Sequence, residues 1–271
     1  MGANSKIEWC DHTFNPWWGC QRVSPGCEHC YAEAFDKRMG GDHWGPAATR
    51  KIASDAYWKQ PHAWNRKAAT GIRTRVFCAS MADVFEDRPE LAAPRGRLWQ
   101  LISDTPHLEW LLLTKRPENA DRLWARATQR VTAQVWAGNV WLGVTVEDQQ
   151  RADERIPHLL CAPAEHRFLS CEPLLGPINL DRWCFKRRGV IDDLIFGSAI
   201  DWVIVGGESG SDARPMRPEW ARAIRDQCAN AGTPFFFKQW GEWATRGNIL
   251  ARVGKRSAGH TLDGVVWQQL P

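Results

Sequence analysis

The chain has 271 residues, of which 44% are hydrophobic and 24% are charged, and its formal net charge is +4. A chain of this length and composition forms one large or two small globular domains with a sizeable core. No apolar run reaches the roughly 18 residues of a membrane span, and the N-terminal residues lack the apolar core of a signal peptide. We therefore expect a cytoplasmic protein without a membrane-spanning segment.

Cysteine and tryptophan are used in an unusual way. The 9 Cys residues, an odd number, suit a reducing compartment better than a disulfide framework. The chain also has 17 Trp but only 2 Tyr, and most of these rings are expected in the core. Five of them near the first cysteines are also candidates for stacking on a nucleobase or an adenine: Trp17, Trp18, Trp44, Trp58 and Trp64. The mild positive charge is compatible with nucleic-acid binding but does not require it.

The apolar pattern predicts alternating helices and strands along the rest of the chain. Helices are predicted over residues 31–39, 94–103, 118–127, 149–160 and 219–231. Strands are predicted over residues 75–80, 109–114, 140–146, 167–171, 202–206 and 234–238. Continuous apolar strands separated by helices indicate βαβ units and a parallel sheet that is buried on both faces.

About seven strands connected in this way predict an α/β fold, specifically a partial (β/α) TIM-like barrel with parallel strands. A flavodoxin-like or Rossmann sheet is the alternative, but no clean GxGxxG motif opens a helix after the first strand. We expect the barrel over residues 1–243, with an insertion at about 40–74, and a C-terminal extension over residues 244–271.

Three cysteines lie close together in a loop that is predicted to follow the first strand: Cys20, Cys27 and Cys30. The last two form a C-x-x-C pair, and Pro25 and Gly26 supply a turn that can fold the first one back. Three converging thiolates are the ligand set of a [4Fe–4S] cluster in which one iron stays open to a substrate or cofactor.

A small zinc site is the alternative interpretation of the same cysteines. A structural zinc ion takes four ligands, and His12 and His29 are candidates for the fourth position. The spacing of the cysteines alone leaves the cluster and the zinc ion open.

Polar residues follow each apolar run, where a parallel barrel gathers its binding and catalytic groups. Lys115 and Arg116 suit an anionic carboxylate or phosphate. Glu208 suits an amino group, a ribose hydroxyl or a substrate proton, and Gly206 and Gly207 allow the backbone to approach a ligand. The remaining candidates at the strand ends are Ser80, Asp83, Thr145 and Glu147.

Cys171 ends another predicted strand. A single cysteine at such a position is usually a small buried hydrophobic residue. In a radical enzyme it is a candidate donor of a hydrogen atom to the substrate, so we count it with Glu208 as a candidate catalytic residue.

Several motifs together resemble the phage-type three-Cys-motif proteins. They are Phe14-Asn-Pro-Trp-Trp-Gly-Cys, Ser24-Pro-Gly-Cys-Glu-His-Cys-Tyr-Ala, Leu113-Thr-Lys-Arg-Pro, Gly143-Val-Thr-Val-Glu, Ser170-Cys-Glu-Pro-Leu-Leu-Gly-Pro-Ile, Val205-Gly-Gly-Glu-Ser-Gly and Phe236-Phe-Lys-Gln-Trp-Gly. This group is similar to a divergent branch of the radical S-adenosylmethionine (SAM) enzymes, nearest to spore photoproduct lyase. The resemblance spans nearly the whole chain.

The resemblance implies that Cys20, Cys27 and Cys30 bind a [4Fe–4S] cluster whose open iron takes the amino and carboxylate groups of SAM. An electron donor would then drive cleavage of SAM to a 5′-deoxyadenosyl radical. Six residues separate the first two cysteines here, whereas the usual radical SAM motif has three. The position of the usual Gly-Gly-Glu motif reads Ser80-Met-Ala-Asp83, so Ser80 or Asp83 is expected to replace it.

We therefore predict an iron–sulfur radical SAM-type lyase or modifying enzyme that acts on a nucleic acid or a nucleobase. The first alternative is a zinc- or cluster-stabilised nucleic-acid-binding protein without catalysis, whose basic C-terminal segment binds phosphates. The second is a hydrolase or nuclease with a divalent ion held by carboxylates, namely Asp83, Glu147, Glu172 and Glu208.

Overall fold

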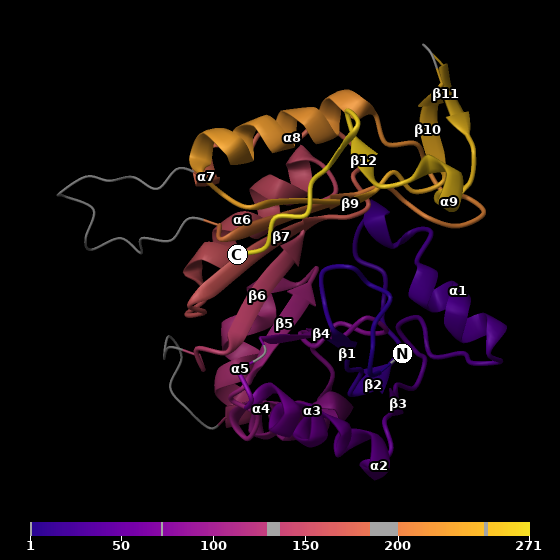
Figure 1. The fold of residues 1–271 in the computed structure, drawn as a ribbon. Helices are drawn as coiled ribbons and strands as arrows, with labels where there is room; N and C mark the ends of the chain where they lie inside the picture. Colours follow the sequence, from indigo (N-terminus) through magenta and orange to yellow (C-terminus); the bar gives the residue numbers. More distant parts are fainter. Residues whose placement is uncertain (1, 72, 129–135, 185–199, 247–248) are drawn as a thin grey trace. The chain divides into compact units, whose positions relative to one another are not determined.

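The computed structural model describes residues 2–71, 73–128, 136–184, 200–246 and 249–271 (Figure 1). The chain divides into two compact units. Unit 1 consists of Met1–Val23, Ala32–Gly143 and Ala162–His166, and unit 2 consists of Ser24–Tyr31, Val144–Cys161 and Arg167–Pro271.

Seven strands form the main sheet, and all of its described pairings are parallel. Their order is β1 (His12–Thr13), β4 (Thr74–Cys78), β5 (Leu108–Thr114), β6 (Val140–Thr145), β7 (His166–Cys171), β8 (Trp202–Gly206) and β9 (Phe235–Gln239). In unit 1, β4 pairs with β1 and β5, and in unit 2, β8 pairs with β7 and β9. Every residue of β6 and β8 is buried, as expected of strands that are covered on both faces. The predicted α/β fold with parallel strands is confirmed.

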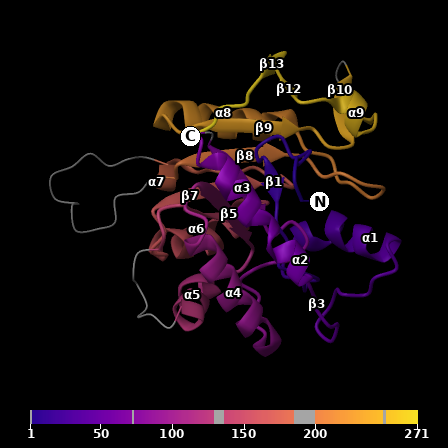
Figure 2. The ribbon, with the colours of Figure 1, turned by 60° about the horizontal axis from the view of Figure 1, so that its bottom comes forward.

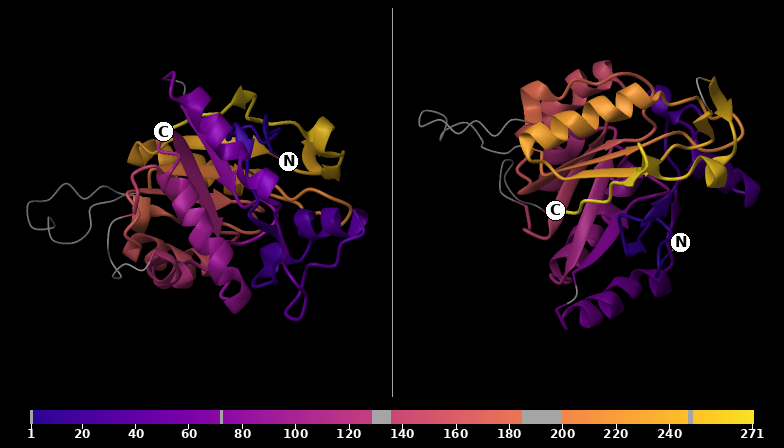
Figure 3. Two further views of the ribbon diagram at one scale, coloured as in Figure 1. Left: turned by 90° about the horizontal axis from the view of Figure 1, so that it is seen from below. Right: turned by 45° about the horizontal axis from the view of Figure 1, so that its top comes forward.

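The predicted helices are present with nearly the expected limits. They are α1 (Tyr31–Arg38), α4 (Ala92–Ser103), α5 (Ala120–Thr128), α6 (Gln149–Cys161) and α8 (Pro218–Ala231). In unit 1, α4 and α5 lie side by side (Figure 2), and in unit 2, α8 lies along β9 (Figure 3). Helix α8 has clear sequence signals at both ends, because Pro218 begins it and Gly232, with φ 68°, ends it in the left-handed conformation.

The predicted insertion and C-terminal extension contain short elements that the sequence pattern does not reveal. The first region holds β3 (Lys51–Ile52), which pairs with β2 (Trp17–Trp18), and helices α2 (Asp55–Trp58) and α3 (Gln60–Ala68). The second holds β10 (Trp243–Arg246), β11 (Ile249–Arg252), α9 (Lys255–Ala258), β12 (Thr261–Leu262) and β13 (Val265–Val266). Residues 72, 247 and 248 of these regions lie outside the described residues. The predicted domain limits stay a prediction.

The remaining elements are single turns. They are η1 (Pro25–Cys27), η2 (Pro89–Leu91), η3 (Pro117–Asn119) and α7 (Asp181–Cys184). None of the helices in the described ranges has the length and apolar character that crossing a membrane requires.

Tryptophan rings fill much of the core. Of the five that we considered for stacking on a base, Trp17, Trp58 and Trp64 are buried, so they serve the packing of unit 1. Another aromatic group in unit 1 surrounds Trp136, whose ring centroid lies 5.7 Å from those of both Trp99 and Trp124. Such contacts add to the burial of apolar area that stabilises the unit.

Replacing Trp110 by Ala should destabilise the protein by about 3–5 kcal/mol, because it removes a large buried ring. Trp110 is 0% exposed, its ring packs edge-on against Phe14 at 5.7 Å, and its Nε1 donates a hydrogen bond to Thr105 Oγ1 at 3.0 Å. Urea unfolding followed by circular dichroism measures the change. The control is Met39→Ala in the same unit, which should shift stability by no more than about 0.5 kcal/mol, since Met39 is 67% exposed. Equal effects of the two substitutions would contradict this account of the core.

Candidate functional site

In unit 1, the backbone around Cys20 is fixed by neighbouring loops. Gly19 has φ 110°, and a Cβ atom there would lie 2.2 Å from His43 O, so only glycine fits. The Gly19 amide donates to Met81 O at 3.0 Å, and the Gly45 amide donates to Cys20 O at 2.9 Å. The position of this cysteine therefore follows from contacts that lie far from it in the sequence.

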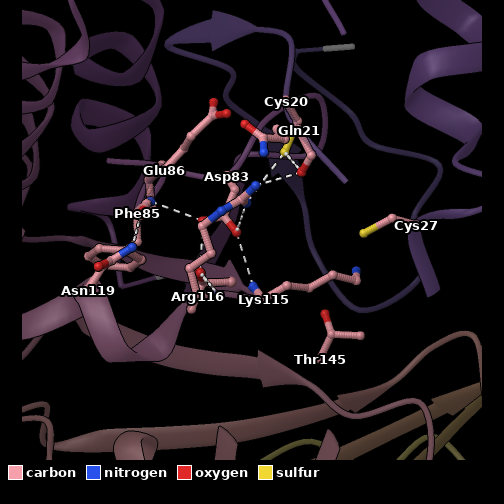
Figure 4. A network of polar contacts seen from close by, with 12 residues as sticks. Cys20, Gln21, Cys27, Asp83, Phe85, Glu86, Lys115, Arg116, Asn119 and Thr145 are labelled. Carbon is pink, nitrogen blue, oxygen red and sulfur yellow. Dashed lines mark hydrogen bonds and ion pairs between the residues drawn. The ribbon is translucent and has the colours of Figure 1, made fainter. Parts of the chain in front are cut away.

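Arg116 lies between Asp83 and the Cys20 segment (Figure 4). Its Nη1 is 2.9 Å from Asp83 Oδ2 and 3.6 Å from Cys20 Sγ, and its Nη2 donates to Gln21 O at 2.6 Å. Burial raises the pKa of the Cys20 thiol to about 12, and the nearby Arg116 cation opposes that shift. The guanidinium thus offsets part of the effect of burial, although the net shift of the Cys20 pKa stays upward.

Asp83 is buried, and hydrogen bonds from the end of β5 hold its carboxylate. Thr114 Oγ1 donates to Asp83 Oδ1 at 2.8 Å, and the Lys115 amide donates to Oδ2 at 3.0 Å. Ser80, also predicted as a site residue, bonds through its Oγ to Asn15 Nδ2 at 3.1 Å. The structure thus brings Asp83, Lys115 and Arg116 together, whereas Ser80 belongs to a neighbouring hydrogen-bond group with Asn15.

A second buried ion pair in unit 1 was not predicted from the sequence. Arg50 Nε and Nη2 bind the two carboxylate oxygens of Glu86 at 2.9 and 2.7 Å. Arg50 Nη1 also donates to His43 O and Ala48 O at 2.9 and 2.7 Å. The pair fixes the loop that carries His43 and Gly45, and it escaped prediction because Arg50 lies in a region without apolar periodicity.

In unit 2, Cys27 and Cys30 lie on the segment Ser24–Tyr31, which we call the cysteine turn. Its regular structure is the 3₁₀ turn η1, in which the Cys27 amide donates to Ser24 O at 2.9 Å and the Glu28 amide to Pro25 O at 3.1 Å. Both thiols are free and half-buried, and Cys27 Sγ lies 3.8 Å from Ser24 Oγ.

Glu147 contacts the cysteine turn from the end of β6. It is fully buried, its Oε1 accepts a short hydrogen bond from Ser24 Oγ, and its Oε2 accepts one from Arg155 Nη1 at 2.6 Å. A Cβ atom at Gly26 would lie 2.4 Å from Glu147 Oε1, so the backbone of the turn rests directly on the carboxylate. Arg155 Nη1 also donates to the backbone oxygen of Thr145 at 2.7 Å, and the Thr145 side chain is buried.

Glu208, at the loop after β8, contacts the same turn. Arg214 Nε and Nη2 bind its two carboxylate oxygens at 2.9 and 2.6 Å, and His29 Nδ1 lies 3.1 Å from Glu208 Oε2. Burial raises the pKa of Glu208, but the hydrogen bonds from Arg214 and His29 outweigh it, and the net shift is downward. Arg214 also reaches Glu28 Oε2 and Pro25 O, both at 2.9 Å.

Gly206 and Gly207 are required by the packing of the protein itself. A Cβ atom at Gly206 would lie 2.5 Å from Glu172 Oε1, and one at Gly207 would lie 1.9 Å from Trp240 O. Glu172 in turn forms an ion pair with Lys238 at 2.9 Å. The predicted approach of a ligand to these glycines stays a prediction.

The donor chemistry of the three motif cysteines fits an iron–sulfur cluster. All three are partly accessible, whereas Cys10, Cys78, Cys171 and Cys228 are buried, and none of these cysteines forms a disulfide. Cys20 belongs to unit 1, and Cys27 and Cys30 belong to unit 2. Within the residues that the structure describes, no group of three or more His, Cys, Asp or Glu side chains is placed to hold a metal ion.

The carboxylates that the hydrolase alternative assigns to a divalent ion each have a basic partner. Asp83 pairs with Arg116, Glu147 with Arg155, Glu172 with Lys238, and Glu208 with Arg214, at 2.6 to 2.9 Å. A magnesium or calcium ion needs carboxylate oxygens as ligands. This pairing does not favour the hydrolase alternative.

The fold is similar to that of a solved structure of a point mutant of spore photoproduct lyase. The TM-score is 0.50 at 12% sequence identity, and the match covers 95% of this chain and 72% of that chain. At such low identity the likeness concerns the fold alone, and it confirms the predicted class of a partial (β/α) barrel with parallel strands. No curated protein matches the chain.

The sequence as a whole matches one family. The match runs over residues 4–271, and the family is described as protein of unknown function (DUF5131). The resemblance to phage-type three-Cys-motif proteins stays a prediction. Since the match covers nearly every residue, the chain belongs to the DUF5131 family.

Proposed function

We propose that the protein is a radical SAM-type enzyme in which Cys20, Cys27 and Cys30 hold a [4Fe–4S] cluster. The observation that supports this most is the set of three free, partly accessible thiols between β2 and α1, in a chain with a fold similar to spore photoproduct lyase. When bound, the cluster and SAM would supply reductive cleavage of SAM and hydrogen abstraction from the substrate, with electrons from a separate donor.

Residues around the cysteines would favour their thiolate form and fix their backbone. Metal ions bind the thiolate form, and the Arg116 cation beside Cys20 Sγ favours that form. Gly19 and Gly45 hold the Cys20 backbone, and η1 holds the backbone at Cys27.

We assign SAM binding to the polar residues and glycines at the strand ends, as the rim of a parallel barrel predicts. These residues are Ser80, Lys115, Thr145, Gly206 and Gly207. Cys171, which is fully buried at the end of β7, stays our candidate for hydrogen-atom donation. Of the rest of the predicted set, Arg116, Glu147 and Glu208 contact the cysteine-bearing segments directly. Asp83 pairs with Arg116.

We propose a nucleic acid or a nucleobase as the substrate. The sequence resemblance to the spore photoproduct lyase group supports this choice. So does an exposed basic pair on α9, Lys255 and Arg256, which makes no ion pair with any described residue. Unpaired basic side chains on a surface are suited to contact phosphates.

Replacing Cys27 by Ala should abolish cluster assembly. After anaerobic reconstitution, the wild-type protein should bind about four iron and four sulfide per chain, absorb near 400 nm and cleave SAM when reduced. The substituted protein should do none of these while keeping its circular dichroism spectrum, because the core is large.

The matched control for this substitution is Cys161→Ala, since Cys161 is free and exposed and lies outside the motif. It should retain full iron and sulfide. A colourless wild-type protein with one zinc ion would instead support the non-catalytic, zinc-stabilised alternative. An iron content that Cys27→Ala leaves unchanged would contradict the assignment of ligands.

Reversing the charges of Lys255 and Arg256, as Lys255→Glu with Arg256→Glu, should weaken DNA binding about tenfold or more. Each lost phosphate contact should also lower the slope of log K against log salt by about one unit. Fluorescence anisotropy over a series of salt concentrations measures both quantities.

A matched control is Arg66→Glu with Lys67→Glu, an exposed basic pair on α3. It changes the net charge by the same amount at a different place. If both double substitutions weaken binding equally, the surface around α9 is not the nucleic-acid site.

A further inference from the structure

The cysteine turn has little structure of its own. Its regular part is a turn of three residues, Pro25–Cys27, and such short 3₁₀ turns have poorer hydrogen-bond geometry than an α-helix. Although its sequence neighbours on both sides belong to unit 1, the turn itself belongs to unit 2. The conformation around Cys27 and Cys30 must therefore come from contacts with the rest of unit 2.

Glu147 makes the first of these contacts. One carboxylate oxygen accepts from Ser24 Oγ and the other accepts from Arg155 Nη1 at 2.6 Å, so both oxygens are engaged by the protein. The Gly26 backbone lies so close to Oε1 that a Cβ atom would meet it at 2.4 Å. Because Glu147 is fully buried, losing Arg155 would leave its charge without compensation.

Glu208 and Arg214 make the second contact, on the other residues of the turn. The Arg214 guanidinium binds Glu208 through Nε and Nη2, reaches Glu28 Oε2 through Nη1, and reaches Pro25 O through Nη2. Glu208 Oε2 also lies 3.1 Å from His29 Nδ1. The turn is thus held at Ser24, Pro25, Glu28 and His29, which flank the two cysteines.

We propose that Glu147 and Glu208 are positioning residues that fix the geometry of the Cys27–Cys30 pair for the metal cluster. The proposal rests on the proposed function, and it assigns the two carboxylates a role other than binding SAM or reacting with a substrate. Groups that orient metal ligands typically contribute about 10- to 100-fold to metal affinity. Each carboxylate is already paired with an arginine, and each of its oxygens has a protein partner. Both groups are therefore suited to hold the turn and not to bind a ligand.

The first test uses the apoprotein and needs no metal. Glu147→Gln and Glu208→Gln should each speed hydrogen–deuterium exchange at the Cys27 and Glu28 amides by about tenfold or more, because a neutral amide with one acceptor oxygen replaces a charged group that accepts through two. Alkylation of Cys27 and Cys30, measured by mass spectrometry relative to the exposed Cys161, should accelerate in parallel.

The control is Glu172→Gln, which removes the charge of another strand-end carboxylate in unit 2, one paired with Lys238 instead of the turn. It should leave the exchange rates of the turn unchanged. If Glu147→Gln and Glu208→Gln behave like this control, the proposal is overturned.

Substitutions in the cysteine turn separate a local effect from general unfolding, because they leave the buried Glu147–Arg155 pair intact. Ser24→Ala removes the hydroxyl that Glu147 binds and should speed exchange in the turn, whereas Ser24→Thr keeps a hydroxyl and should restore slow exchange. Gly26→Ala should also displace the turn, since its Cβ would overlap the carboxylate. Unchanged exchange in both Ser24→Ala and Gly26→Ala would overturn the role of Glu147.

The second test uses protein reconstituted with iron and sulfide. The Glu147 and Glu208 substitutions should lower iron affinity about 10- to 100-fold and alter the electron paramagnetic resonance spectrum of the reduced cluster. Wild-type protein that binds no cluster would overturn the proposed function, whereas faster exchange in the two variants would still support their hold on the turn. A cluster with unchanged affinity and spectrum in both variants would overturn the positioning role alone.

Discussion

A buried, ionised carboxylate needs a cationic or hydrogen-bonding partner, since the penalty for burying an isolated charge is several kcal/mol. In this protein the carboxylates at the strand ends satisfy that requirement with arginine or lysine, as in the pair of Asp83 with Arg116 at 2.9 Å. The same guanidinium donates to Gln21 O beside Cys20. Arg116 therefore does more than neutralise charge, because its remaining donor also holds the backbone next to Cys20.

This arrangement makes the cysteine-bearing segments depend on the whole fold. Ser24 and Glu147 are separated by 123 residues, and His29 and Glu208 by 179. Loop closure over such distances costs entropy that only a formed sheet can offset. The conformation of the C-x-x-C segment thus depends on residues that follow β6 and β8.

The sequence pattern predicted the helices and strands well, but it did not predict which charged side chains pair with one another. Strand β8 begins and ends where its apolar run does, and α8 ends at Gly232, because burial and helix capping act on neighbouring residues. Two-residue strands such as β12 are too short to show a period. Which arginine reaches which carboxylate depends on how strands and loops meet, and no spacing in the sequence encodes the pairing of Arg50 with Glu86.

The cysteines themselves differ in their electrostatic surroundings. Cys20 Sγ lies 3.6 Å from a guanidinium nitrogen, whereas Cys27 Sγ lies 3.8 Å from the neutral Ser24 hydroxyl, which donates a hydrogen bond to Glu147. Burial disfavours an anion at Cys20 and leaves its pKa raised, and the Arg116 cation offsets only part of that shift. Hydrogen bonds to ligand sulfurs are among the main determinants of the potential of an iron–sulfur centre. In the proposed enzyme Arg116 would therefore stabilise added negative charge at Cys20. The contacts of Cys27 and Cys30 would instead fix mainly the positions of these two ligands.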